Sequence, residues 1–160
     1  MKSPKQTPPS SPIAEPTNRL SLLEATLQTR NSGARWFYWI AGLSIVNSLI
    51  VHSGGDASFP LGLGATLLLN DMARPFALAL DFLLIGFFVL CGKQAIQGAS
   101  WAFVLGGLLY TLDTFLMLVA KEWLGVGLHL WALSSLFYGY KANQAVRELQ
   151  RHPVTSSPAP

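Results

Sequence analysis

The segment 108-LLYTLDTFLML-118 decides the fold, because it places one carboxylate, Asp113, inside an otherwise apolar stretch. It belongs to a longer apolar run, residues 99–120, which approaches the roughly 20 residues that a helix needs to cross about 30 Å of hydrocarbon. A carboxylate inside such a span is costly unless a partner satisfies it. We therefore expect a membrane-spanning helix, and the partner of Asp113 becomes the main question about function.

The composition agrees with a membrane protein. Apolar residues make up 51% of the 160 residues and charged residues only 12%, whereas soluble domains carry about 25% charged residues. The net charge of +3 does not indicate a nucleic-acid-binding protein, because the basic residues flank apolar runs and form no patch with interleaved aromatic residues. The single cysteine, Cys91, excludes an intrachain disulfide and a CxxC metal or redox motif.

Four apolar runs predict four spans within a membrane domain at residues 33–141. Each span must be a helix, because lipid offers no partner for open backbone groups. Short links between the later runs make antiparallel neighbours. The expected fold is therefore all-α, a four-helix transmembrane bundle with spans at residues 36–52, 75–92, 99–120 and 123–141.

The flanking segments have a different composition. Residues 1–17 are rich in Pro and Ser and are expected to be disordered, as is the tail that follows a cytoplasmic helix extension within residues 142–160. Residues 18–32 predict an amphipathic helix on the membrane surface, with a capping box at Ser21 and Glu24. A partly ordered linker remains the alternative for this segment.

The first loop contains an outer segment, residues 59–72, that is unusual for a loop. Its part 59-FPLGLGATLLL-69 is apolar but too short to cross a bilayer. We expect a short re-entrant or interfacial helix at the outer mouth of the bundle.

The basic residues predict the orientation. With the N-terminus in the cytoplasm, only Arg74 and Lys121 lie outside. The other nine basic residues lie inside, at positions Lys2, Lys5, Arg19, Arg30, Arg35, Lys93, Lys141, Arg147 and Arg151. Because cytoplasmic segments of membrane proteins are enriched in Lys and Arg, both termini are expected to be cytoplasmic.

Each span carries a polar residue at a similar depth. With about 1.5 Å of rise per residue, the four lie roughly 8–12 Å below the outer edge, at Asn47, Asp81, Asp113 and His129. We therefore predict one polar cluster in the outer half of the bundle. Tyr110 precedes Asp113 by three residues and shares its helix face, so its hydroxyl is a further candidate member.

Three interpretations of this cluster remain open. In the first, Asp113 and His129 form a buried pair that fixes helix register. In the second, the cluster binds or transports a proton, a cation or the polar head of an amphiphile. In the third, Asp81, Asp113 and His129 hold the metal of an intramembrane enzyme. A lone histidine without an HExxH pair favours a structural or binding role over an enzyme, and no cofactor is predicted.

Four sequence blocks resemble a group of small uncharacterised bacterial membrane proteins with four spans. The resemblance covers residues 35–140 and is carried by 35-RWFYWIAGLSIVNSLI-50, 61-LGLGAT-66, 108-LLYTLD-113 and 126-VGLHLWAL-133. It implies a protein of the bacterial cytoplasmic membrane and no catalytic activity. The blocks contain Asn47, Asp113 and His129, but not Asp81. The lipid bilayer is the expected partner, and a second copy of the chain or another membrane subunit remains an open alternative. Nucleic acid is not an expected partner.

Overall fold

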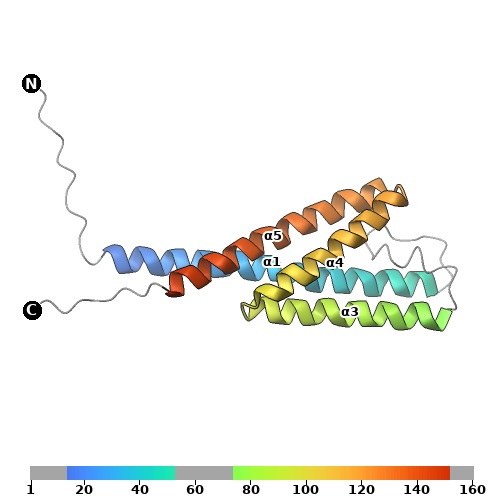
Figure 1. Cartoon of the computed structure of the whole chain (residues 1–160), viewed down its shortest axis with the longest axis horizontal. Helices are drawn as coiled ribbons and strands as arrows, with labels where there is room; N and C mark the ends of the chain where they lie inside the picture. Colours follow the sequence, from blue (N-terminus) through green and yellow to red (C-terminus); the bar gives the residue numbers. More distant parts are fainter. Residues whose placement is uncertain (1–13, 53–73, 152–160) are drawn as a thin grey trace, which may run out of the picture.

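The computed structural model describes residues 14–52 and 74–151, and side chains within residues 18–50 and 79–151. Over these ranges the chain is all-helical, with four helices and no strand, so the predicted all-α class is confirmed. The helices are α1 (Ala14–His52), α3 (Arg74–Ile96), α4 (Ser100–Val119) and α5 (Trp123–Arg151) (Figure 1). The outer segment 59–72 and most of both predicted disordered ends lie outside the described residues.

Helix α1 is longer than the sequence predicted. It continues without a break for 39 residues and joins the expected surface helix 18–32 to the expected span 36–52. At about 1.5 Å per residue it is roughly 58 Å long, far more than a bilayer's hydrocarbon core. Its N-terminal half projects past the turn between α3 and α4 (Figure 1). No break occurs at 32-SGA-34 because Gly33 and Ala34 are buried in a helix contact.

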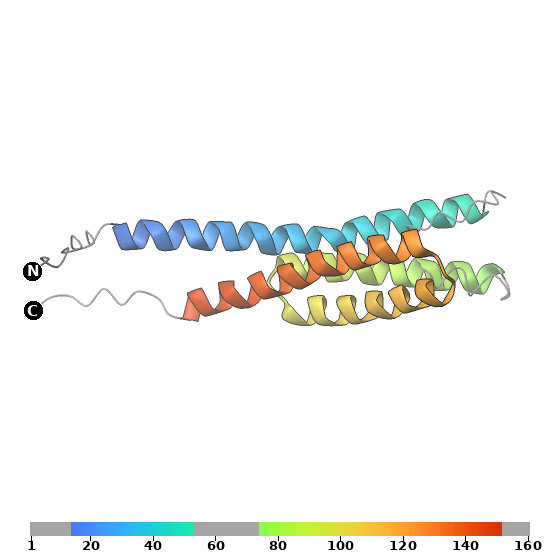
Figure 2. The same ribbon diagram turned by 90° about the horizontal axis from the view of Figure 1, so that it is seen from above.

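The helices pack as antiparallel neighbours around α1. Both α3 and α5 pack extensively against α1, whereas α4 packs mainly against α5 and less against α3. Gly98, with φ +89°, lies in the turn between α3 and α4, and Lys121, with φ 61°, lies in the turn between α4 and α5. The ends of α1 and α5 nearest the chain termini lie at the same end of the bundle (Figures 1 and 2).

Helices α1 and α5 cross where two glycines meet. A Cβ atom on Gly33 would lie 2.5 Å from the Cα atom of Gly139 and 2.8 Å from the carbonyl oxygen of Ser135. The two backbones are therefore in direct contact, as small residues allow in membrane helix pairs. Away from this point the helices diverge, and α5 crosses α1 obliquely (Figures 1 and 2).

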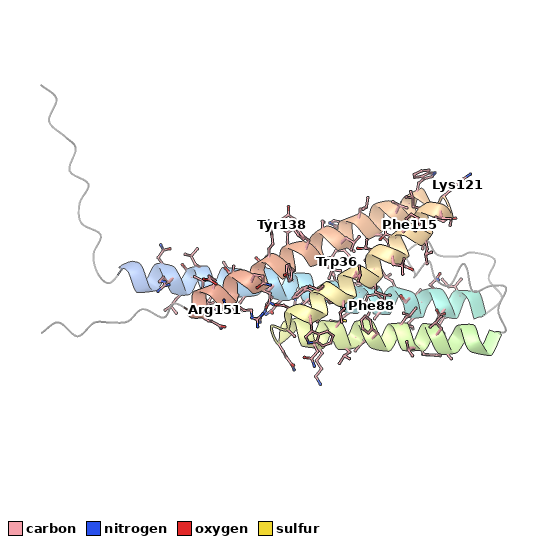
Figure 3. All side chains as sticks on the ribbon, viewed as in Figure 1. Trp36, Phe88, Phe115, Lys121, Tyr138 and Arg151 are labelled. Atoms are coloured by element: carbon pink, nitrogen blue, oxygen red, sulfur yellow. The ribbon has the colours of Figure 1, made fainter. Side chains whose placement is uncertain are left out.

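The bundle has an apolar core, but it also buries two carboxylates and exposes many large apolar side chains. The carboxylates of Asp81 and Asp113 are buried, with 3% and 4% of each residue exposed. Large apolar side chains cover the outer surface of all four helices, including Leu49, Phe82, Leu83, Leu108, Phe115, Leu124, Leu130 and Phe137. Tyr138 likewise points away from the bundle (Figure 3). Such a large exposed apolar surface around buried charges is typical of a protein in lipid.

Two helices are long and apolar enough to cross a membrane. These are α3, over Ala79–Ile96, and α4, over Ser100–Val119. In the part of the chain that the structure describes, α1 and α5 do not meet the same criterion of length and composition. Aromatic and polar residues such as those in 36-WFYW-39 and 134-SS-135 lower their mean hydropathy. The helical bundle is therefore established, with α3 and α4 as two candidate spans.

Candidate functional site

Asp113 and His129 form a direct contact between α4 and α5. His129 Nε2 lies 2.9 Å from Asp113 Oδ2, and 1% and 5% of the two side chains are exposed. Both residues lie eight positions from Lys121, which is in the turn that joins the two helices. Residues equally far from the turn of an antiparallel hairpin lie at the same level, which is why the depth estimate predicted this contact correctly.

The second ring nitrogen of His129 defines where the protons lie. His129 Nδ1 is 2.8 Å from the carbonyl oxygen of Gly125. A carbonyl only accepts, so Nδ1 donates and carries hydrogen. Nε2 then either donates to an ionised Asp113 or accepts from a protonated one. In both cases one proton lies between the two side chains and the pair has no net charge, which suits its apolar surroundings.

Tyr110 contributes its ring to this pair. The ring centroids of Tyr110 and His129 are 4.5 Å apart, with planes inclined by 11°, so the two rings are stacked. As predicted, Tyr110 lies on the same face of α4 as Asp113. Its hydroxyl makes no hydrogen bond with any residue that the structure describes, so the predicted role of that hydroxyl in the cluster is not seen.

A second hydrogen-bonded pair, which is partly buried, joins α1 and α3. Ser48 Oγ donates a hydrogen bond of 2.6 Å to Asp81 Oδ2, and Asn47 is buried beside Ser48 on α1. The four predicted polar residues are therefore all buried, with hydrogen bonds between α1 and α3 and between α4 and α5. Sequence reasoning missed Ser48. The signal was the spacing of Ser44, Asn47 and Ser48, which places three small polar residues on one helix face.

The described residues form no metal centre. Within residues 18–50 and 79–151, no group of three His, Cys, Asp or Glu side chains is close enough to hold a metal ion. The proposed ligand set of Asp81, Asp113 and His129 is therefore wrong. The reason is geometric: His129 already directs one ring nitrogen to Asp113 and the other to a backbone carbonyl.

A cavity of about 420 Å³ lies between α1 and α5. Tyr110 and His129 form part of its wall, so it reaches the neutral pair. Trp36 and Trp131 meet edge to face across the two helices, with ring centroids 4.9 Å apart. None of the described residues that line the cavity is charged: they are Trp36, Trp39, Ile40, Leu43, Tyr110, Leu128, His129, Trp131 and Ala132.

The helix crossing explains why this cavity exists. Gly33 and Gly139 hold the two backbones in contact. The lining residues on both helices come from the side of this crossing nearer the α4–α5 turn, where the helices diverge (Figure 1). Large side chains only partly fill the widening gap, so an apolar space remains in front of Tyr110 and His129.

A second polar site fastens the other end of the bundle. Asn143 is fully buried and its amide donates to the carbonyl oxygen of Gly98, at 3.1 Å, and to Ser100 Oγ, at 2.9 Å. Arg147 Nη1 also donates to Ser100 Oγ, at 3.0 Å. Burial lowers the pKa of the nearby Arg30 guanidinium. Sequence reasoning missed Asn143, although the buried spacing of Leu136, Gly139, Asn143 and Val146 is that of a packed helix face.

No protein-family model, curated protein or solved structure matches this chain. The functional proposal therefore rests on the side-chain geometry described above.

Proposed function

We propose that this chain is a four-span integral membrane protein that holds an uncharged, lipid-soluble molecule in the cavity between α1 and α5. One observation carries the proposal. The bundle contains a cavity of about 420 Å³ whose described walls are apolar and aromatic and which reaches a neutral Asp113–His129 pair. Its volume is within the range of about 300–1,000 Å³ that is common for small-molecule sites.

The surface of the bundle supports four spans. No charged residue occurs between Trp36 and Ile50 in α1 or between Trp123 and Tyr140 in α5. Both of these segments expose large apolar side chains, and α1 packs against α3, which is apolar enough to cross a membrane. A layer of lipid that surrounds α3 and α4 would therefore surround these parts of α1 and α5 as well.

The distribution of charge supports cytoplasmic termini. Lys121 lies at one end of the bundle and Arg151 at the other (Figure 3). Arg74 starts α3 at the same end as Lys121. The other basic residues with described side chains belong to the end that carries the termini: Arg19, Arg30, Arg35, Lys93, Lys141, Arg147 and Arg151. Under the positive-inside rule, this distribution of basic residues supports an orientation with both termini in the cytoplasm.

The rim of the cavity indicates where a ligand enters. Trp39 and Trp131 line the cavity and yet are 64% and 61% exposed on the outer surface of the bundle. In a bilayer this surface faces lipid. A charged head would lose its hydration in the cavity without finding an opposite charge on a described residue, which favours an uncharged ligand from the lipid phase.

The proposal is tested by filling the cavity. Leu128 lines it, whereas Leu130 points outward from the same helix and is 57% exposed. The protein in nanodiscs is incubated with N-phenyl-1-naphthylamine, a flat, uncharged, lipid-soluble probe. Bound probe is separated by gel filtration, extracted and quantified by chromatography. We expect Leu128→Trp to abolish saturable binding and Leu130→Trp to retain it. No saturable binding to the wild type, or equal binding by both variants, would overturn the proposal.

The second candidate is a structural role without a ligand. It is favoured by the closed geometry of the Asp113–His129 pair, in which both ring nitrogens of the histidine are hydrogen-bonded. Such a pair fastens α4 to α5 whether or not the cavity is occupied. The binding experiment separates the two candidates, because a purely structural protein retains no probe in the wild type or in either variant.

A further inference from the structure

We infer that the cavity between α1 and α5 takes the ring of a lipid-soluble quinone, with the isoprenoid tail of the quinone in the bilayer. This inference rests on the proposed function and names the chemical class of the ligand. Three properties of the wall carry it: its flat side chains, the direction of its hydrogen bonding and its lack of charge.

The first property is planarity. Aromatic or imidazole rings make up five of the nine lining side chains, at Trp36, Trp39, Tyr110, His129 and Trp131. Planar rings gain most from another flat, polarised ring, because offset and edge-to-face contacts add to simple burial. A flexible acyl chain gains only the burial. The lining therefore favours a ligand with a flat head.

The second property is the direction of hydrogen bonding. An indole N–H only donates, and the indole N–H groups of the three lining tryptophans form no hydrogen bond with any residue that the structure describes. The Tyr110 hydroxyl is unused by the described residues and is also able to donate. His129 has no ring nitrogen left to hydrogen-bond with a ligand, because Asp113 and the Gly125 carbonyl already bind both of them. A ligand head that carries acceptors, such as the two carbonyl oxygens of a quinone, is able to pair with these donors.

The third property is neutrality. No Lys, Arg, Asp or Glu is among the described residues that line the cavity. Phosphate, carboxylate and ammonium heads would therefore lack a charged partner there. Asp113 lies behind His129 and shares a proton with it, so it supplies no net charge to a cation. Quinone heads are uncharged and meet this condition.

The length of the cavity also fits. The lining residues on α1 extend from Trp36 to Leu43, which at about 1.5 Å per residue is roughly 10 Å along the helix. This length accommodates a substituted ring and the first part of a tail. The exposed rim at Trp39 and Trp131 leaves the remainder of the tail in lipid.

A competition experiment tests the class of ligand. Wild-type protein loaded with N-phenyl-1-naphthylamine is titrated with a benzoquinone that carries a decyl tail, or with decanol as a tail-matched alcohol. The retained probe is again extracted and quantified, so that quenching by the quinone does not affect the result. We expect the quinone to displace the probe at a concentration about tenfold lower than decanol does, the effect of roughly one added hydrogen bond.

A variant sharpens the test. Tyr110→Phe removes one donor from the wall and keeps the ring that stacks on His129. We expect it to weaken displacement by the quinone about tenfold and to leave displacement by decanol unchanged. Equal potency of quinone and alcohol, or no displacement by the quinone, would overturn the quinone assignment while leaving ligand binding intact. Failure of the probe itself to bind would instead overturn the proposed function.

Discussion

The Cα atom of Gly139 lies 2.5 Å from the position that a Cβ atom on Gly33 would occupy. The reverse substitution is also crowded, since a Cβ on Gly139 would lie 2.9 Å from the Cα of Gly33 and 2.9 Å from Cε1 of Phe103. The obstructing atoms on the helix partner are backbone atoms, which cannot rotate away. The contact between α1 and α5 therefore depends on glycine at both positions.

Gly33→Ala is expected to destabilise the bundle by about 1–3 kcal/mol, the usual cost of forcing an extra group into a packed site. Gly42→Ala on the same helix is the control, because nothing lies within 4 Å of the Cβ position there. The control should match or slightly exceed the wild type. Unfolding of the purified protein by denaturant in mixed micelles provides the measurement. Equal stability of the two variants would contradict the glycine contact.

The Asp113–His129 pair predicts non-additive losses. Removal of either partner leaves the other buried and unpaired, so Asp113→Ala and His129→Ala should each cost about 3–5 kcal/mol. The double variant should be scarcely less stable than either single variant. Asp113→Asn should cost less than Asp113→Ala, because an amide N–H is able to donate to His129 Nε2. Losses that add in the double variant would show that the two side chains do not stabilise each other.

Asn143 predicts a stability effect at the opposite end of the bundle. Asn143→Ala removes the hydrogen bonds to the Gly98 carbonyl and to Ser100 Oγ, so a loss of about 1–3 kcal/mol is expected. Gln144→Ala is the neighbouring control and removes only an exposed hydrogen bond to the Tyr140 hydroxyl. Thermal unfolding in detergent should distinguish the two variants. If Asn143→Ala unfolds at the same temperature as the control, Asn143 does not hold the α3–α4 turn to α5.

The turn at Gly98 predicts a low tolerance for side chains. Its φ of +89° is unfavourable for other residues, and a Cβ there would lie 3.4 Å from Arg30 Nη1 and 3.5 Å from Asn143 Oδ1. Gly98→Ala should therefore cost about 1–3 kcal/mol. Gly107→Ala serves as the control, since its Cβ position on α4 is open. Denaturant titration of both variants provides the measurement, and no difference between them would count against the strained turn.

The proposed topology predicts the side of the membrane that each turn faces. Reporter enzymes fused after Gln97 and after Arg151 should be active in the cytoplasm, and a reporter fused after Lys121 should be active outside. These three positions lie in the α3–α4 turn, at the end of α5 and in the α4–α5 turn. A cytoplasmic signal after Lys121 would exclude the four-span arrangement.

Contacts set by spacing within one helix or across one short turn could be predicted from the sequence. The distance of Asp113 and His129 from Lys121 was enough to bring them together. The turn between α4 and α5 is so short that residues equally far from it lie at the same level of the hairpin. An estimate of depth was therefore enough to predict the contact.

Other features depend on which faces of distant helices meet, and spacing alone does not define this. Gly33 lies between the expected surface helix 18–32 and the expected span 36–52 and was given no role; in the structure it is buried against α5. Ser48 became the partner of Asp81 only once α1 and α3 were aligned. Asn143 lay beyond the predicted span and was not expected to be buried.

Gly33 is the midpoint of α1, with 19 residues on each side of it between Ala14 and His52. Each half of the helix is therefore roughly 28 Å long. The N-terminal half extends past the α3–α4 turn (Figure 1), whereas the C-terminal half packs against α3 and carries Trp36 to Leu43 of the cavity wall. One continuous helix therefore connects the region past that turn to the cavity, through the contact between Gly33 and Gly139.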